Sequence, residues 1–198
     1  MHLFVAKIDD YDLVDLEKKL LPYLLPSDKK KYSSFISYKR KKEWLLVRYL
    51  LNSYIGTVKI IYKSNGQPSL VDRKNFISIS HSKDYVIICL STKPCAIDVD
   101  SVNRNYNKII KKFLHREENI VFAKNNESLA LAWCAKEAIY KLVSAENVSF
   151  AEHIRIFFKG SLQNFGYFYG QYLPLSIKIK LFYYRLNSNI IVIARYAN

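Results

Sequence analysis

The chain has 198 residues, half of them hydrophobic, which is enough to bury a substantial core and argues against intrinsic disorder. Thirty-one Lys and Arg against seventeen Asp and Glu give a formal charge of +14, which favours a polyanionic partner such as a nucleotide, a nucleic acid, an acidic membrane or an acidic protein. No stretch reaches the roughly 20 apolar residues that cross a bilayer, and residues 1–12 do not read as a secretion signal.

The first half of the chain predicts a strand, then helices, then further strands. Leucines at helical spacing follow the apolar start, Pro22 and Pro26 end that helix, and Ser27 marks the next helix start. Gly56 is a suitable stop for the longest helix of this half. The predicted strands are residues 2–8, 58–62, 76–80 and 85–90, and the predicted helices are residues 13–21, a segment from 27, and residues 39–54.

The helix predicted over residues 39–54 carries a basic run at its start, from Lys39 to Lys42. Arg40 and Arg48 lie off its apolar stripe. Such cations either bind phosphate or form the solvated face of an amphipathic helix, and the pattern leaves both interpretations open. The apolar stripe consists of Trp44, Val47, Leu51 and Tyr54.

The second half begins with a strand at residues 96–100 and contains a strong helix at about 127–143. Both halves thus combine helices and strands, and Lys93-Pro94 marks the boundary between them. We predict an α+β fold, with one half at residues 1–95 and the other at residues 96–198. Residues 109–114 read as helical and 115–119 as a charged turn, and the later strands are predicted at 154–158, 167–169, 177–183 and 190–196.

The three cysteines, Cys89, Cys95 and Cys134, are odd in number and form no Cys-x-x-Cys pair. All three sit in apolar surroundings, so we interpret them as buried, reduced thiols. Reduced thiols without a secretion signal or a membrane span predict a cytoplasmic protein with no membrane partner.

Asp98 and Asp100 lie two apart on a predicted strand, so their side chains emerge on one face while Ile97 and Val99 point to the other. Two carboxylates on one face repel each other unless a cation sits between them. A solvated strand end with two acids of no special role is the competing interpretation, and the pair alone does not exclude it.

Glu137 and Lys141 lie one helical turn apart, a spacing that by default indicates a surface salt bridge. The combination with Asp98 and Asp100 changes that interpretation. Carboxylates from separate elements suit the hard Mg²⁺ ion, which shares phosphate oxygens with its substrate. The sequence therefore predicts a magnesium diphosphate site.

The strand at residues 77–82 ends in serines and a histidine, from which donors can reach a ligand at a sheet edge. The alternative is that these side chains form hydrogen bonds only within the protein, at the end of the strand. Ser-His hydrolytic chemistry is set aside, because neighbouring residues on a strand point to opposite faces and no Gly-x-Ser-x-Gly elbow occurs. No Walker A, Gly-x-Gly-x-x-Gly or zinc-ribbon pattern is present.

The motifs stand in an order that resembles the Sfp-type 4′-phosphopantetheinyl transferases, the enzymes that activate carrier proteins of fatty-acid, polyketide and nonribosomal peptide synthesis. The resemblance spans roughly residues 39–143 and rests on the order and spacing of the motifs. They are Asn65-Gly66-Gln67-Pro68, Ile79-Ser80-His81-Ser82, Ala96-Ile97-Asp98-Val99-Asp100 and Trp133-Cys134-Ala135-Lys136-Glu137-Ala138-Ile139-Tyr140-Lys141, preceded by a helix with Glu43-Trp44-Leu45 and Arg48-Tyr49-Leu50-Leu51.

The resemblance implies a pseudo-symmetric monomer of two similar α+β halves, with coenzyme A in the cleft between them. It also implies residue roles. Lys141 would contact the diphosphate, and Glu137 would be the general base. The implied Mg²⁺ ligands are Asp98, Asp100 and Glu137; the implied coenzyme A contacts are Arg40, Arg48, Gly66, Pro68, Ser80, His81 and Lys141, with Ser80 and His81 at the 3′-phosphate and Gly66 and Pro68 beside the adenine.

Three positions depart from the family pattern. Ala96 replaces a common Gly, Asp100 replaces a common Glu, and Gln67 replaces the lysine of the turn. The shorter acid at position 100 would move the metal or admit a water ligand. None of these changes removes an essential chemical group.

The resemblance thus implies Mg²⁺-dependent transfer of phosphopantetheine from coenzyme A to a serine of an acidic acyl or peptidyl carrier protein. Two alternatives stay open. A basic nucleic-acid-binding module would use the sixteen Tyr and eleven Phe for stacking but leaves the acids unexplained, so we expect no nucleic-acid partner. A family member that only binds its carrier protein would have no need of Asp98, Glu137 and Lys141.

Overall fold

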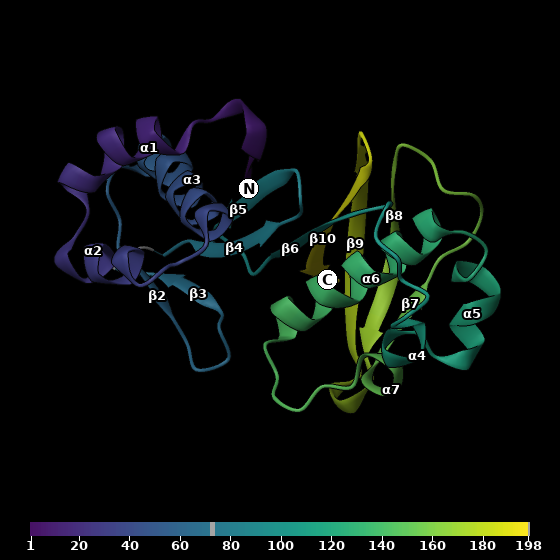
Figure 1. Ribbon diagram of the computed structural model, residues 1–198. Helices are drawn as coiled ribbons and strands as arrows, with labels where there is room; N and C mark the ends of the chain where they lie inside the picture. Colours follow the sequence, from purple (N-terminus) through teal and green to yellow (C-terminus); the bar gives the residue numbers. More distant parts are fainter. Residues whose placement is uncertain (72–73, 198) are drawn as a thin grey trace.

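The computed structural model describes residues 1–71 and 74–197, and it has a mixed α+β fold whose two parts lie side by side (Figure 1). In the first part, helix α3 packs against strands β1 and β5, and helix α1 packs on α3. The elements of this part are β1 (His2–Lys7), η1 (Ile8–Asp10), α1 (Leu13–Leu20), η2 (Leu21–Tyr23), α2 (Pro26–Ser33), α3 (Tyr38–Ile55), β2 (Ile60–Tyr62), β3 (Pro68–Leu70), β4 (Phe76–His81) and β5 (Tyr85–Ser91).

Local capping explains where the helices of the first part begin and end. Asp12 accepts hydrogen bonds from the first amides of α1, and Ser37 accepts one from Arg40 at the start of α3. Gly56 ends α3 with a φ of 74°, a conformation that glycine adopts without a Cβ clash. The strands form an antiparallel sheet in the order β1-β5-β4 and a separate hairpin of β2 and β3.

The second part is a five-stranded antiparallel sheet in the order β6-β10-β9-β8-β7, and helix α6 lies across one face of it (Figure 1). Asn125 caps the start of α6. The elements are β6 (Ala96–Ser101), α4 (Ile110–Phe113), α5 (Arg116–Phe122), α6 (Asn126–Val143), α7 (Phe150–His153), β7 (Ile154–Phe157), β8 (Phe165–Tyr172), η3 (Leu173–Leu175), β9 (Ile177–Leu186) and β10 (Asn189–Tyr196).

Buried apolar side chains gather in three clusters. One cluster draws on residues 6–90 and another on residues 96–194. The third lies between the two parts and includes Ile87 and Cys89 from β5, Ile97 from β6 and Ile193 from β10. An apolar interface therefore joins the parts. The boundary after residue 95 and the similarity of the two halves stay predictions.

The sequence-based prediction was wrong at two points. Residues 115–119 are not a simple turn, because His115 caps helix α5 in a capping box with Glu118. Tyr54 is exposed although it lies on the predicted apolar stripe. Arg48, for which the sequence pattern leaves both a solvated face and phosphate binding open, is buried, so the solvated face does not apply to it. Helix α7 and strand β3 were not predicted, since each is too short to show a period.

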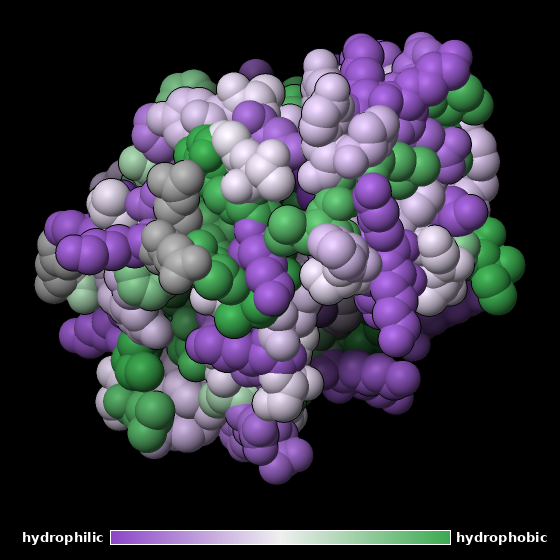
Figure 2. Space-filling view, turned by 90° about the vertical axis from the view of Figure 1, so that its left-hand side faces the viewer, coloured by the Kyte–Doolittle hydropathy of each residue, from purple (hydrophilic) through white to green (hydrophobic). Residues whose placement is uncertain are grey.

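The cysteine prediction is confirmed, because Cys89, Cys95 and Cys134 are all free and buried. Among the described residues, no helix combines the length and the apolar character needed to span a membrane. Figure 2 views the molecule from the side of its first part, where hydrophilic side chains surround an apolar area at the centre.

Candidate active site

The acidic strand β6 is held in place where the free edges of the two sheets meet. β4 is an edge strand of the first sheet, and β6 is an edge strand of the second. The amide of Ile97 donates to Ser78 Oγ at 3.0 Å, and the amide of Val99 donates to Ser80 Oγ at 3.3 Å. Both serines are buried and lie two apart, so they face the same side of β4. Their hydroxyls thus satisfy the edge amides of β6.

Asp98 and Lys141 form the centre of the site, on β6 and α6. Asp98 is 5% exposed, and its Oδ1 accepts hydrogen bonds from Lys141 Nζ at 2.7 Å and from Ser80 Oγ at 2.8 Å. Lys141 Nζ also donates to Ser80 Oγ at 3.1 Å and to the carbonyl of Ile97 at 3.2 Å. The fold therefore brings together the predicted metal ligand and the predicted diphosphate lysine, and Lys141 pairs with Asp98 across the two elements.

Asp100 lies further along the same strand and has a cation of its own. Its Oδ2 is 2.5 Å from Arg104 Nη1. The guanidinium of Arg104 lies over the rings of Trp133 and Tyr106, at 4.8 and 5.5 Å from the ring centroids. Such cation–π contacts fix the orientation of the arginine. Arg104 is thus a residue of this site that the sequence analysis missed.

Glu137 lies on α6, one turn before Lys141. Burial raises the pKa of Glu137 to about 7, and the neighbouring charge of Asp98 is the next cause. Lys141 and Arg104 lower this pKa, whereas Asp100 raises it further. The three carboxylates predicted to bind metal therefore act on one another electrostatically.

The donor chemistry suits a magnesium ion, although the carboxylates are not gathered around a metal-sized centre. Within residues 1–71 and 74–197, no three His, Cys, Asp or Glu side chains are arranged to hold a metal ion. Lys141 and Arg104 instead neutralise Asp98 and Asp100. Burial and the charge of Asp98 raise the pKa of Glu137, and a divalent cation among the carboxylates would oppose both effects. Oxygen ligands are those that Mg²⁺ prefers. Metal binding here stays a prediction.

A cavity beside α3 collects most of the residues predicted to contact the nucleotide. Its lining includes Arg40, Arg48, Gly66, Pro68 and His81. They come from the helix, from the turn between β2 and β3, and from the end of β4, so the fold joins segments far apart in the sequence.

Ser80 is also predicted to contact the 3′-phosphate of the nucleotide, but its environment differs from that of the residues that line this cavity. It is 6% exposed, and its hydroxyl donates to Asp98 and accepts from Val99 and Lys141. Its observed hydrogen bonds hold β4, β6 and α6 together. The predicted contact between Ser80 and the nucleotide stays a prediction.

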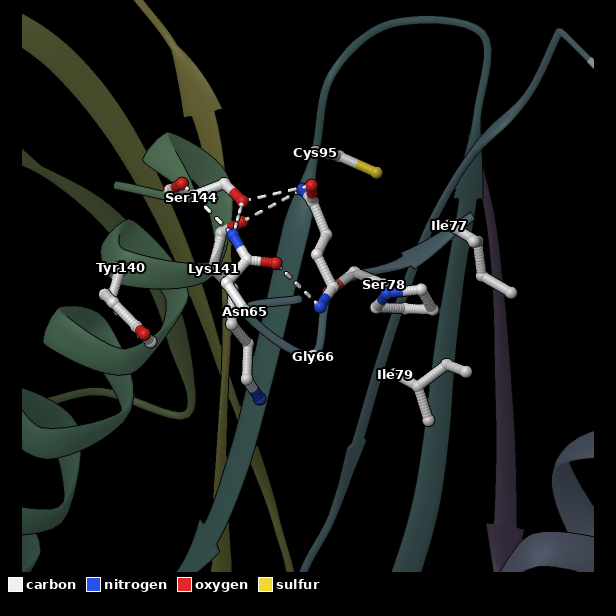
Figure 3. Close-up of a pocket in the computed structure, with 11 residues that line it drawn as sticks. Asn65, Gly66, Ile77, Ser78, Ile79, Cys95, Tyr140, Lys141 and Ser144 are labelled. Carbon is white, nitrogen blue, oxygen red and sulfur yellow. Dashed lines mark hydrogen bonds between the residues drawn. The ribbon is translucent and has the colours of Figure 1, made fainter. Parts of the chain in front are cut away.

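A second cavity adjoins the first and is lined by Lys141. It lies between the turn around Gly66, strand β4 and the C-terminal end of α6, with Tyr140 and Lys141 on the helix side (Figure 3). Gly66, Pro68 and Ile79 line both cavities. The two cavities therefore adjoin, one with Arg40 and His81 and the other with Lys141, whose Nζ contacts Asp98.

Arg48 lines the first cavity from a buried position. Its Nη2 and Nε lie 3.0 and 3.3 Å from the two carboxylate oxygens of Asp28, and its guanidinium stacks 3.1 Å from the ring centroid of Trp44. Burial lowers the pKa of Arg48, and Asp28 opposes this shift. Ion pairing with Asp28 is what allows this cation to be buried.

The turn that closes the second cavity is tied to α6 across the two parts. Asn65 Nδ2 donates to Ser144 Oγ at 2.6 Å and to the Ser144 carbonyl at 3.2 Å (Figure 3). Ser144 Oγ donates to Gln67 Oε1 at 3.0 Å. Gly66 has a φ of 82°, which suits glycine. Gln67, which replaces the lysine of the family pattern, thus helps to hold the turn against α6.

A second residue missed from the sequence is Glu43. Its side chain is 6% exposed and lines the first cavity beside Arg40 and His81. The sequence signal for Glu43 was its position four residues after Lys39 and three after Arg40 on the same helix. The same spacing also occurs on ordinary solvated helices. For Arg104, the i, i+4 spacing after Asp100 was equally unspecific.

These features define a class of protein: an α+β protein of two parts with a buried Asp98–Lys141 pair where its sheets meet and a basic cavity nearby. A model of the 4′-phosphopantetheinyl transferase superfamily matches residues 94–194. The chain belongs to this superfamily.

A curated relative carries the name of the same enzyme class. The 4′-phosphopantetheinyl transferase gsp of Aneurinibacillus migulanus is 29% identical over an alignment of 131 residues that covers 58% of this chain and 55% of the relative. The chain thus spans a little more than half the length of this relative. The resemblance inferred from the motifs is confirmed at the level of the superfamily.

Proposed function

We propose that this chain transfers the 4′-phosphopantetheine group from coenzyme A to a serine hydroxyl of an acyl or peptidyl carrier protein, with Mg²⁺, and releases 3′,5′-ADP. One observation carries the proposal: a cavity lined by Arg40 and His81 adjoins a second cavity lined by Lys141, and Lys141 Nζ pairs with Asp98. A nucleotide with an extra phosphate fits the basic cavity, and a diphosphate fits the cavity with Lys141.

The reaction is a displacement at the β-phosphorus of coenzyme A, so catalysis depends on positioning and on neutralising charge. Lys141 Nζ, which is partly exposed and donates to Asp98, would donate to a diphosphate oxygen. Bound Mg²⁺, held by Asp98, Asp100 and Glu137, would supply further neutralisation of the diphosphate. Arg104 would keep Asp100 in its orientation.

Glu137 is our candidate for the general base. It lies one helical turn from Lys141, and so next to the place where the incoming serine hydroxyl must lose its proton. The carboxylate would accept that proton directly or through a water molecule.

The proposed partners are coenzyme A and an acidic carrier protein. A net charge of +14 would speed the encounter with such a carrier and orient it. The three free cysteines support a reducing, cytoplasmic setting, in which we expect the protein to act as a monomer.

The direct test incubates the protein with coenzyme A, Mg²⁺ and several apo carrier domains and follows the intact mass of each carrier. We expect at least one carrier to gain phosphopantetheine, and chelation of Mg²⁺ to stop the reaction. Absence of labelling on every carrier, together with thermal stabilisation by a single-stranded oligonucleotide and none by coenzyme A with Mg²⁺, would support the nucleic-acid module instead.

Replacing Glu137 by alanine tests the proposed base. We expect Glu137→Ala to lower the labelling rate by about 100-fold, because proton removal from the serine loses its acceptor. Glu117→Ala is the matched control, since Glu117 is exposed on α5 and should leave the rate unchanged. A Glu137→Ala protein that labels the carrier at the parent rate would remove this assignment.

A further inference from the structure

Glu43 is a buried acid in a cavity whose other charged lining residues are basic. It lies on α3, and the whole residue is 4% exposed. Glutamates are rarely buried to this degree unless they are paired. A carboxylate in this place would also repel a phosphate, so its presence requires an explanation beyond the binding of a ligand by cations.

The surroundings of Glu43 are three side chains that carry or can carry positive charge. Its Oε1 lies 3.5 Å from Lys39 Nζ and 3.8 Å from His81 Nδ1, and its Oε2 lies 3.6 Å from Arg40 Nη1. These separations are longer than hydrogen bonds. Within the described residues, Oε1 is buried and has no hydrogen-bond partner. The carboxylate thus attracts all three groups but binds none of them tightly.

His81 connects two of these groups. Arg40 Nη1 lies 3.0 Å from His81 Nε2, and a guanidinium can only donate, so Nε2 accepts this hydrogen bond. Nδ1 then carries the ring proton and faces Glu43. Burial lowers the pKa of His81, Glu43 opposes that shift, and Arg40, Lys141 and Lys39 add to it. Glu43, His81 and Arg40 therefore form a ring in which the position of each depends on the other two.

We propose that Glu43 is a positioning residue that holds Lys39, Arg40 and His81 together as a preformed site for a phosphate monoester. This inference rests on the proposed function and assigns to Glu43 the preference for a nucleotide that carries a 3′-phosphate. Lys39 and Arg40 have half-exposed side chains on one helix turn, and without the carboxylate between them they would repel each other and sample many rotamers. Two permanent cations against one carboxylate still leave the cluster positive, so a phosphate is attracted.

The physical gain is preorganisation. Ordering long cationic side chains during binding costs affinity, and a carboxylate that orders them beforehand removes this cost. Because Glu43 makes no short hydrogen bond with them, the cations can turn toward the phosphate when it arrives. When Arg40 turns to the phosphate, Nε2 of His81 loses its donor and becomes free to take a proton. The Nδ1–H, which faces Glu43, would then stabilise the protonated ring beside the phosphate.

The test measures binding of 3′,5′-ADP and of 5′-ADP by isothermal titration calorimetry, using the full chain. For Glu43→Ala we expect binding of 3′,5′-ADP to weaken by about 10-fold, or about 1.4 kcal/mol, and binding of 5′-ADP to change less than about twofold. The parent's selectivity for the 3′-phosphate would fall by the same factor. Glu43→Gln keeps the shape and one acceptor for His81 but not the charge, so its loss should be intermediate.

Glu17→Ala is the matched control. Glu17 is a partly buried acid of the same part of the chain that accepts a hydrogen bond from Tyr32, away from the cavity. Its replacement should leave the selectivity unchanged. Thermal melting of each variant shows whether it is folded, and Glu43→Gln, which alters no volume, carries the test if Glu43→Ala does not fold.

Each other outcome decides against the proposal. Equal weakening for both nucleotides would show that Glu43 only supports the fold of the cavity. Tighter binding of 3′,5′-ADP in Glu43→Ala and Glu43→Gln would show that Glu43 merely repels the phosphate. If the parent prefers 3′,5′-ADP and both variants keep that preference, this inference fails and the proposed function stands. If the parent binds neither nucleotide, both fail.

Discussion

Ser80 illustrates how much a single hydroxyl contributes at the junction of the two parts. Its oxygen accepts from the Val99 amide and from Lys141 Nζ, and its proton goes to Asp98. A hydroxyl is one of the few groups that can both donate and accept in so small a space. The serine therefore joins the edge of β6 to the charged centre of the site.

Replacing Ser80 by alanine should lower the free energy of unfolding by about 1–3 kcal/mol, because the buried Val99 amide loses its acceptor and Asp98 loses a donor. Urea denaturation measures the change. Ser53→Ala is the control, since that exposed hydroxyl only donates to the Leu50 carbonyl within α3, and it should cost much less. Equal stability of the Ser80→Ala and parent proteins would contradict the role assigned to this hydroxyl.

Helix α5 depends on a buried charge pair that also fixes α6. Glu118 Oε2 accepts from the His115 amide at 2.8 Å and from Lys136 Nζ at 2.6 Å. Its Oε1 accepts from the Ile156 amide at 2.9 Å. Lys136 is fully buried and donates further to the carbonyls of Phe150 and Ile154. One pair thus connects four neighbouring elements, α5, α6, α7 and β7.

Removing the cation from this pair should be costly. Burial lowers the pKa of Lys136 to about 8, against the opposing charge of Glu118. In Lys136→Met the carboxylate of Glu118 stays buried without its cation, so we expect a loss of about 3–5 kcal/mol in the free energy of unfolding.

Chemical denaturation compares Lys136→Met with Lys159→Met, whose exposed lysine lies in the loop after β7 and should change stability by less than about 0.5 kcal/mol. A Lys136→Met protein as stable as this control would show that the pair contributes no net stability.

Among the described residues, the contacts that join the two parts include an apolar cluster, the serine hydroxyls of β4, and the turn around Gly66 that reaches α6. The first two are buried and fix the relative position of the sheets. The third is exposed and lies over the cavities. It is therefore the contact that affects ligand binding most and stability least.

Replacing Asn65 by alanine should weaken binding of coenzyme A by about 5- to 10-fold, because the turn loses its hydrogen bonds to Ser144 and must be ordered when the ligand binds. We expect the melting temperature to change little. Calorimetric titration with coenzyme A measures the affinity, with Asn119→Ala on exposed α5 as the control. Unchanged affinity in Asn65→Ala would mean that the turn does not close on the ligand.

The sequence alone predicted the long helices and every strand except the three-residue β3, because hydrophobic period and capping are local properties. It also predicted that Asp98 and Lys141 would meet, since the motif order resembles that of a known family. It missed α5, where His115 acts as the cap in place of a more usual residue. It left the role of Arg48 open, because the burial of this cation depends on Asp28, which lies on another helix.

What the sequence determined by itself is the inventory of charges and the elements that carry them. What only the tertiary structure decided is which charges are partners: Asp98 with Lys141, Asp100 with Arg104, and Glu43 with the cations around His81. Local pattern cannot settle this, because electrostatic partners are chosen by distance and burial in space. Those quantities appear only when the two parts pack together.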